Sequence, residues 1–406
     1  MNTDELLSAY ADLAVRVGVN LQPGQHVLVE GKLEHAPLIR ALTEAAYRAG
    51  AAYVSVTYSD DHVRRAMIEH GPEDALSWTP PHLLAALQHV DATGGARISV
   101  AGDAEPALLA DLDPTRVGRA KMVDLAKLRL EQVNRRSVSW TIVACPNEGW
   151  AAAALGEPDV ERLWDAVAKA TRLYEPDPVQ AWKEHLARLA ERADALNERR
   201  FEAVHFRGPG TDLTVGLHED SRWISARFAT ASGIRHVPNL PTEEVFTTPD
   251  FRRVEGTVAA SRPLQLSAEG VTVTDLEVTF EEGRAVKVEA SSGADVVRAQ
   301  MAIDEGAARL GEVALVDRAS AVGETGITFN STLFDENATS HIAYGGAYTF
   351  AVDGAAGLST DELLARGINH STVHTDFMIG GPGVDVAGVT RDGGRITIIE
   401  DNVWQL

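Results

Sequence analysis

The chain has 406 residues, of which 45% are hydrophobic and 24% are charged, and this length exceeds the roughly 250–300 residues at which one hydrophobic core stops growing. Its formal net charge of -22 at pH 7 argues against binding of a nucleic-acid backbone. No apolar run reaches the roughly 18 residues that a membrane span requires, so we expect a soluble protein of two domains with no nucleic-acid or membrane partner.

The N-terminus is predicted to begin a helix and not an export signal. Residues 3–18 have apolar side chains at the spacing of an amphipathic helix. The first ten residues have neither a basic head nor an apolar stretch of signal-peptide length, and the single cysteine, Cys145, cannot form an internal disulfide. Both features predict a cytoplasmic protein.

Strand and helix patterns alternate in the first part of the chain. HVLVEG at 26–31, a helical stretch at 36–48 and YVSVTY at 53–58 form a strand–helix–strand unit. The alternation continues through a helix at 61–69, strands at 89–95 and 97–102, a helix at 114–134 and a strand at 138–144. It predicts a largely parallel sheet with helices on both faces. No G-x-G-x-x-G follows the first strand, so we interpret this lobe as a scaffold and substrate wall and not as a dinucleotide-binding domain.

A domain boundary is predicted between two long helices. The helical patterns at 160–173 and 179–199 are interrupted by the segment EPDP, and proline favours the end of a helix. We therefore place the change of domain at Tyr174 to Pro178. This divides the chain into an α/β domain at residues 1–176 and a second domain at 177–406.

The second domain has mainly strand patterns. These patterns lie at residues 201–208, 212–217, 222–229, 271–280, 284–291, 312–317, 326–329 and 395–404. A helical pattern at 294–310 interrupts them. The order predicts an α+β catalytic lobe with an antiparallel-rich sheet, following the α/β lobe with its largely parallel sheet.

Two segments of the second domain combine carboxylates, imidazoles and a phenol. LFDENATSHIAYGGAY contains Glu336, His341 and Tyr348, and NHSTVHTDFMIG contains His374 and Asp376. On an extended strand the last two residues project from the same face. Convergent oxygen and nitrogen donors of this kind bind divalent cations. A histidine and an aspartate at this spacing can instead form a hydrogen-bonded pair on the surface. The presence of Glu336, His341 and Tyr348 nearby favours a metal site over such a pair.

Three further glutamates are candidates for the same site. Glu243 and Glu244 are adjacent in PNLPTEEVFTTPD, and on an extended segment one should point inward and the other outward. Glu312 lies at the start of the apolar run VALV. An isolated glutamate is usually exposed to solvent, so the assignment of these glutamates as metal ligands needs further support.

The context is a resemblance that covers the whole chain. The strings NLPTEEVFT, FNSTLFDENATSHIAYGGAY and NHSTVHTDFMIG, in this order and at these separations, resemble signatures of the M29 metallopeptidases, the thermophilic aminopeptidase family. The likeness includes GWA at 149–151 and the closing EDNVW. Three long motifs in register are much more specific than any single spacing.

The resemblance implies a site for two divalent metal ions. It assigns as ligands Glu244, Glu312, Glu336, His341, His374 and Asp376. It makes Glu312 the bridging carboxylate and Tyr348 a catalytic phenol beside the metals. Relatives often have glycine where this chain has Glu243, which favours Glu244 as the ligand. Zinc, cobalt, magnesium and manganese all suit such donors, so the native metal stays open.

The function that the resemblance implies is that of an aminopeptidase. It would hydrolyse N-terminal residues from peptides with a free N-terminus, through a water molecule held between two metals, and would form a homodimer. Two alternatives stay open. One is a metal-dependent dipeptidase or amidase, and the other is a non-enzymatic binding protein that a metal stabilises.

Overall fold

The computed structural model describes residues 1–406, apart from the side chain of Pro114, and the chain divides into two compact units. Unit 1 contains Met1–Glu184, Arg227–Thr242 and Leu266–Val271. Unit 2 contains His185–Ala226, Glu243–Gln265 and Thr272–Leu406. The domain boundary expected between residues 176 and 177 stays a prediction.

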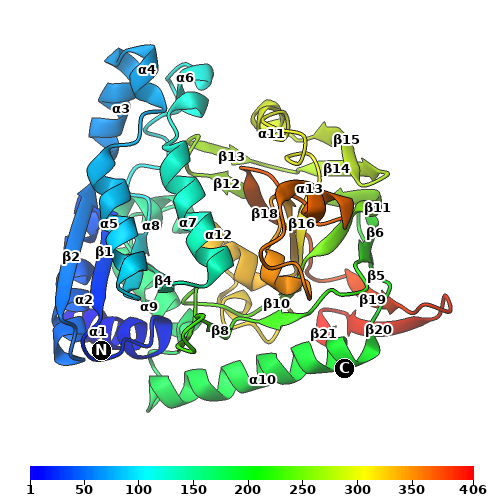
Figure 1. Cartoon of the computed structure of the whole chain (residues 1–406), viewed down its shortest axis with the longest axis horizontal. Coiled ribbons are helices and arrows are strands. Elements are labelled where there is room, and N and C mark those ends of the chain that lie inside the picture. Colours follow the sequence, from blue (N-terminus) through cyan, green and yellow to red (C-terminus); the bar gives the residue numbers. More distant parts are fainter. The chain divides into compact units, whose positions relative to one another are not determined.

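Unit 1 contains a four-stranded sheet in the order β2-β1-β3-β4, in which all neighbours are parallel (Figure 1). Its strands are β1 (His26–Lys32), β2 (Tyr53–Ser59), β3 (Ala96–Ala101) and β4 (Ser139–Ala144). Because side chains alternate along a strand, β1 directs Leu28 to one face and Val27 and Val29 to the other, and all three are buried. The α/β lobe with a parallel sheet is confirmed.

Unit 1 also contains a series of helices. They are α1 (Thr3–Leu13), α2 (Ala36–Arg48), α3 (Asp61–His70), α4 (Glu73–Leu76), α5 (Pro81–Ala92), α6 (Pro114–Arg119), α7 (Val123–Arg135), α8 (Glu148–Leu155) and α9 (Val160–Ala170). The helix α10 (Pro178–Arg199) begins in unit 1 and ends in unit 2. Leu87 of α5 and Leu125 of α7 pack with Leu28 of the sheet. Burial of such aliphatic side chains contributes roughly 1.5–3 kcal/mol each.

Two predictions within unit 1 are wrong. The strand expected at 89–95 is instead the last turn of α5 and the turn that follows, because Leu87 and Val90 continue the helical spacing and pack into the core. The single helix expected at 114–134 is divided into α6 and α7. Ala120 ends α6 with non-helical backbone angles and packs against Ile68, so tertiary contact overrides the helical pattern there.

Unit 2 contains two antiparallel sheets, of eight and five strands. The first has the order β15-β14-β11-β6-β5-β19-β20-β21, and the second has the order β18-β17-β16-β10-β7. The eight strands are β5 (Ala203–Gly208), β6 (Thr211–Leu217), β11 (Pro249–Ala259), β14 (Glu277–Glu281), β15 (Arg284–Glu289), β19 (Asp385–Val389), β20 (Arg395–Glu400) and β21 (Val403–Trp404). The five are β7 (Ile224–Ser225), β10 (Val245–Thr247), β16 (Leu310–Leu315), β17 (His341–Gly345) and β18 (His374–Met378). The antiparallel-rich second lobe is confirmed.

Several element predictions in the second domain are wrong. The strands expected at 222–229 and 271–280 are each divided between two sheets, the first as β7 and β8 (Phe228–Ala229) and the second as β13 (Val271–Val273) and β14. The helix α11 (Ala294–Met301) ends well before residue 310, and the backbone at Gly306 approaches the carbonyl of His370 so closely that a Cβ would lie 2.2 Å from it. The strand expected at 326–329 is absent from the described structure. There the Phe329 N–H donates to the carboxylate of Asp335 and not to a neighbouring strand.

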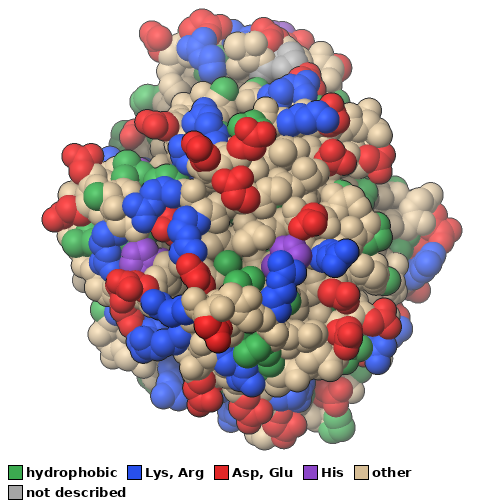
Figure 2. Space-filling model, turned by 90° about the vertical axis from the view of Figure 1, so that its right-hand side faces the viewer, with side chains coloured by type: hydrophobic (Ala, Val, Ile, Leu, Met, Phe, Trp, Pro, Cys, Tyr) green, Lys and Arg blue, Asp and Glu red, His purple; other side chains and the backbone are tan. Residues whose placement is uncertain are grey.

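Acidic and basic side chains are interspersed on the face drawn in Figure 2, and hydrophobic side chains are scattered over it. No helix among the described residues is both long and apolar enough to cross a bilayer.

Candidate metal centre

Four of the predicted ligands project from one face of the five-stranded sheet. Glu312 on β16 pairs with Ala343 on β17, which in turn pairs with Asp376 on β18. His341 is two residues from Ala343, and His374 is two residues from Asp376. Residues two apart on a strand share a face, so the four side chains point to the same side.

The middle strand leaves space between these donors. Ala343 contributes only a methyl group between Glu312 and Asp376, and Gly345, opposite His374, contributes no side chain. Gly345 has φ of +104°, and a Cβ there would lie 2.1 Å from the carbonyl oxygen of Val373. Only glycine fits this close approach.

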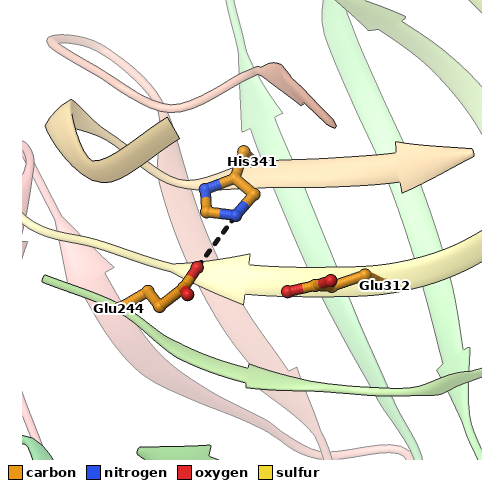
Figure 3. Close-up of side chains that lie close together, drawn as sticks. All are labelled: Glu244, Glu312 and His341. Atoms are coloured by element: carbon orange, nitrogen blue, oxygen red, sulfur yellow. Dashed lines mark ion pairs between the residues drawn. The ribbon is translucent and has the colours of Figure 1, made fainter. Parts of the chain in front are cut away.

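Glu244 completes the first group of donors. It precedes β10, and its Oε2 lies 3.0 Å from Nε2 of His341 (Figure 3). In Figure 3 the side chains of Glu244, Glu312 and His341 point toward one another. One donor atom from each lies within 4.8 Å of the others, and all three side chains are buried. These distances would allow the three residues to coordinate one cation.

A second group of donors adjoins the first. His374 Nε2 lies 3.4 Å from Glu312 Oε2 and 3.6 Å from Asp376 Oδ1. Donor atoms of these three residues also lie within 4.8 Å of one another. Glu312 therefore belongs to both groups.

Backbone carbonyls orient the two imidazoles. His374 Nδ1 lies 2.7 Å from the carbonyl oxygen of Gly346, and His341 Nδ1 lies 3.4 Å from that of Thr339. A carbonyl only accepts hydrogen bonds, so Nδ1 of His374 carries the hydrogen. In the neutral ring the Nε2 lone pair then faces Glu312 and Asp376, as in metal-binding histidines.

The charges of the cluster favour the binding of cations. Burial, followed by repulsion from Asp376 and Glu244, raises the pKa of Glu312 to about 7 although His374 opposes the shift. Burial also raises the pKa of Glu336 well above its ordinary value, with Asp376 and Glu244 adding to the effect. Burial alone would lower the pKa of His341, but the hydrogen bond and charge of Glu244 raise it to about 10. The site thus attracts positive charge, and its mixed oxygen and nitrogen donors suit divalent metals.

Glu336 lies at the edge of this arrangement. It begins the short helix η4 (Glu336–Ala338), which follows α12 (Thr332–Asp335), and its side chain is buried. Its Oε1 accepts a hydrogen bond of 3.3 Å from Nδ2 of Asn337. Glu336 belongs to neither group of mutually close donors, yet its charge acts on the other carboxylates.

The two adjacent glutamates have different surroundings. Glu244 lies beside His341, whereas Oε2 of Glu243 lies 3.5 Å from Nε2 of His185, and both residues of this second pair are buried. The backbone N–H of Glu243 donates to Oδ1 of Asn337 at 2.8 Å. Sequence reasoning missed the contacts of His185 and Asn337. Asn337 stands within the motif LFDENATSHIAYGGAY, and a short polar residue directly after the candidate ligand Glu336 was the available signal.

Tyr348 lies beside the second group. Its ring centroid is 5.0 Å from that of His374, and its ring is stacked on Phe350 with the centroids 5.3 Å apart. Thr248 Oγ1 donates to the Tyr348 carbonyl at 2.9 Å and holds the backbone. Burial raises the pKa of the phenol, so the hydroxyl keeps its proton at neutral pH.

Comparisons with known proteins identify the family of the chain. The model of the family described as thermophilic metalloprotease (M29) matches residues 3–404. The chain is 43% identical over 404 residues to aminopeptidase T of Thermus thermophilus, with 98% of each chain covered. It is 39% identical over 410 residues to aminopeptidase PepS of Streptococcus thermophilus, covering 99% of this chain and 98% of the relative.

A solved structure, wild-type AmpT from Thermus thermophilus, matches with a TM-score of 0.90 at 42% identity and covers 99% of both chains. The expected enzyme class, a metal-dependent hydrolase of peptide bonds, is confirmed. The chain belongs to the thermophilic metalloprotease (M29) family.

Proposed function

We propose that this protein is an aminopeptidase that removes N-terminal residues from peptides with the help of two divalent metal ions. The observation that carries the proposal is that Glu312 belongs to two groups of mutually close donors. The proposed ligands are Glu244, Glu312, Glu336, His341, His374 and Asp376. The relatives named as aminopeptidases support the reaction.

Charge balance supports two cations over one. The four carboxylates among the ligands carry four negative charges when ionised, and two divalent cations carry four positive charges. When bound, such cations supply Lewis-acid polarisation of the peptide carbonyl and lower the pKa of a water molecule toward about 7. Zinc, cobalt, magnesium or manganese would suit these donors.

The chain's own residues orient the reactants in this proposal. The protonated phenol of Tyr348 donates a hydrogen bond to the carbonyl oxygen that gains negative charge. The bond from His374 Nδ1 to Gly346 keeps the imidazole fixed while charge develops beside it. Burial of Glu244, Glu312 and His341 excludes bulk water, so electrostatic interactions within the site are stronger than in solution.

Hydrolysis of two matched substrates tests the proposal. The metal-loaded protein should hydrolyse L-leucine amide but not N-acetyl-L-leucine amide, because an aminopeptidase reads the free amine. Glu312→Gln should abolish hydrolysis, whereas Glu324→Gln, an exposed glutamate of the same unit, should not. Equal hydrolysis of both amides would identify an amidase, and cleavage of Leu-Gly without cleavage of Leu-Gly-Gly-Gly would identify a dipeptidase. Metal binding without any hydrolysis would leave a structural role for the metal.

The metal number and the assembly require separate measurements. Titration of the metal-free protein should reach two ions per chain. We also propose a cytoplasmic homodimer, as the family resemblance implies, and the buried free thiol of Cys145 suits a reducing compartment. Light scattering at the exit of a sizing column should give twice the chain mass of 43.6 kDa.

A further inference from the structure

A second candidate site lies in unit 1, where two neighbouring parallel strands end. The strand β1 ends at Lys32, and β3 ends at Ala101. In the order β2-β1-β3-β4 the chain continues from β1 to one side and from β3 to the other, so the strand order reverses between them. Open α/β sheets bind ligands in the crevice outside such a reversal point.

The structure has a cavity at this point. Its volume is about 230 Å³, and residues of unit 1 line it. The charged part of the lining consists of Lys32, Asp61, Arg64, Asp103 and Glu105. Ligand pockets for drug-sized molecules measure roughly 300–1,000 Å³, so this cavity suits a smaller molecule.

The strand ends that form the crevice are held rigidly. His35 is fully buried, and its Nδ1 accepts a hydrogen bond of 3.1 Å from the Lys32 N–H, while Nε2 donates to the Gly102 carbonyl at 2.7 Å. Burial lowers the pKa of His35, which keeps the ring neutral for these two roles. Gly102 has φ of +126°, and a Cβ there would lie 2.5 Å from the Cys145 carbonyl oxygen. One imidazole therefore joins the ends of β1 and β3.

The lining presents both signs of charge in a small space. Lys32 Nζ lies 2.5 Å from Asp61 Oδ2 and 3.2 Å from Asp103 Oδ1. Arg64 donates to the Ala268 carbonyl at 3.0 Å, so its charge is not paired with a carboxylate in that contact. Glu105 also lines the cavity, and its Oε1 lies 2.6 Å from Nε2 of His62. Because carboxylates and cationic side chains both line the cavity, a molecule with one ammonium and one carboxylate would find partners for both.

We propose that this crevice binds a free α-amino acid with an aliphatic side chain. The ammonium group would lie against Asp103 and Asp61, and the carboxylate would lie against Arg64. The aliphatic side chain would contact the remaining apolar wall, to which Pro106 and Leu109 contribute. The binding does not depend on the proposed function. Only the biological role of this binding rests on the proposed function, because an aminopeptidase releases such amino acids and the crevice would bind a product of the enzyme.

Calorimetric titration with L-leucine tests the proposal. The full-length Glu312→Gln variant, treated with a chelator, removes product binding at the candidate metal centre as an explanation. It should bind L-leucine at one site per chain, and it should bind isoamylamine and N-acetyl-L-leucine about tenfold more weakly or worse, since each lacks one charged contact. Absence of binding by L-leucine, or equal binding of the three compounds, would overturn the proposal.

A pair of variants places the binding in the crevice. In the same background Asp103→Asn should weaken L-leucine binding about tenfold or more. Asp111→Asn is the matched control, because Asp111 pairs with Arg65 in the same region but does not line the cavity. Unchanged affinity in Asp103→Asn would refute the site. If that variant fails to fold, Leu109→Phe serves as the test, because the larger side chain would occupy part of the cavity and should prevent binding of L-leucine. Unchanged affinity of Leu109→Phe for L-leucine would then refute the site.

The two proposals fail separately. Leucine binding in the Glu312→Gln background together with no amide hydrolysis by the metal-loaded natural chain would refute the proposed function alone. Hydrolysis without leucine binding in that background would refute the crevice site alone.

Discussion

Replacement of Asn337 by leucine should weaken metal binding, although Asn337 is not a ligand. Its side chain is fully buried and joins two segments that carry candidate ligands. Oδ1 accepts from the N–H of Glu243 at 2.8 Å, next to Glu244, and Nδ2 donates to Glu336 Oε1 at 3.3 Å and to the Leu333 carbonyl at 3.0 Å. One amide therefore sets the distance between two carboxylates of the site.

The magnitude follows from these three contacts. Leucine has the same branching of heavy atoms as asparagine, so Asn337→Leu removes the hydrogen bonds and keeps the branched outline of the side chain. It leaves the Glu243 N–H and the Leu333 carbonyl buried without their partner, at about 1–3 kcal/mol each. The free energy of unfolding of the metal-free protein should fall by about 2–6 kcal/mol. Loss of a residue that orients ligands typically costs about 10–100-fold in metal affinity.

Competition with a coloured chelator measures the metal affinity, and urea unfolding measures the stability. Asn197→Leu is the matched control. Asn197 also lies in unit 2 and exchanges hydrogen bonds of 2.9 Å with the backbone N–H and carbonyl of Trp223, away from the candidate ligands. It should lose stability but keep its metal affinity. Asn337 has no role in positioning the ligands if Asn337→Leu loses as much stability as Asn197→Leu but binds metal as tightly as the natural chain.

Four further outcomes are expected. Tyr348→Phe should lower kcat for L-leucine amide about 100-fold with metal content unchanged, because an oxyanion donor is lost; normal turnover would remove that role. Glu336→Gln should bind metal more weakly yet melt at a higher temperature without metal, since a buried carboxylate repelled by its neighbours becomes neutral. Tyr10→Phe should lower the free energy of unfolding by about 1–3 kcal/mol in urea, because the buried hydroxyl donates to the Leu240 carbonyl at 2.7 Å and accepts from the Ala144 N–H at 3.1 Å. Burial lowers the pKa of His236 from 6.5 to about 4, so the unfolded chain takes up a proton first as the pH falls; stability should decline below pH 6.5 toward pH 4, by at most about 1.4 kcal/mol per pH unit, and His236→Phe should flatten this decline.

Elements with a complete local pattern could be predicted from the sequence. The helix predicted at 36–48 has those bounds in the structure, because its apolar spacing is regular and glycine follows its end. The errors fall where distant residues decide the backbone. Val90 and Thr93 are β-branched and suggest a strand when read alone, yet the packing of Val90 with Leu87 makes them part of a helix end. The Phe329 N–H is taken by Asp335, a contact that no periodicity reveals.

The candidate site divides in the same way. The shared face of His374 and Asp376 follows from a spacing of two on one strand, which is local information. The alignment of Glu312 with Asp376 across Ala343 depends on the register of three strands, and a shift of one residue would turn Glu312 to the opposite face. The choice between Glu243 and Glu244 depends on register for the same reason. The sequence identifies the residues of each motif, whereas the distances between their side chains depend on how the strands pair in the sheet.

The two faces of the five-stranded sheet have different roles: one carries candidate ligands, and the other packs into the core. On β17 the residues His341 and Ala343 face the candidate ligands, while Ile342 and Tyr344 are fully buried on the other face. Tyr344 donates to Gln300 at 2.5 Å, with its ring centroid 6.3 Å from that of Phe377. Burial of these side chains stabilises the folded state, whereas repulsion among the carboxylates destabilises it. The polar face is therefore free to hold more negative charge than a metal-free protein would favour, and the affinity for cations is the result.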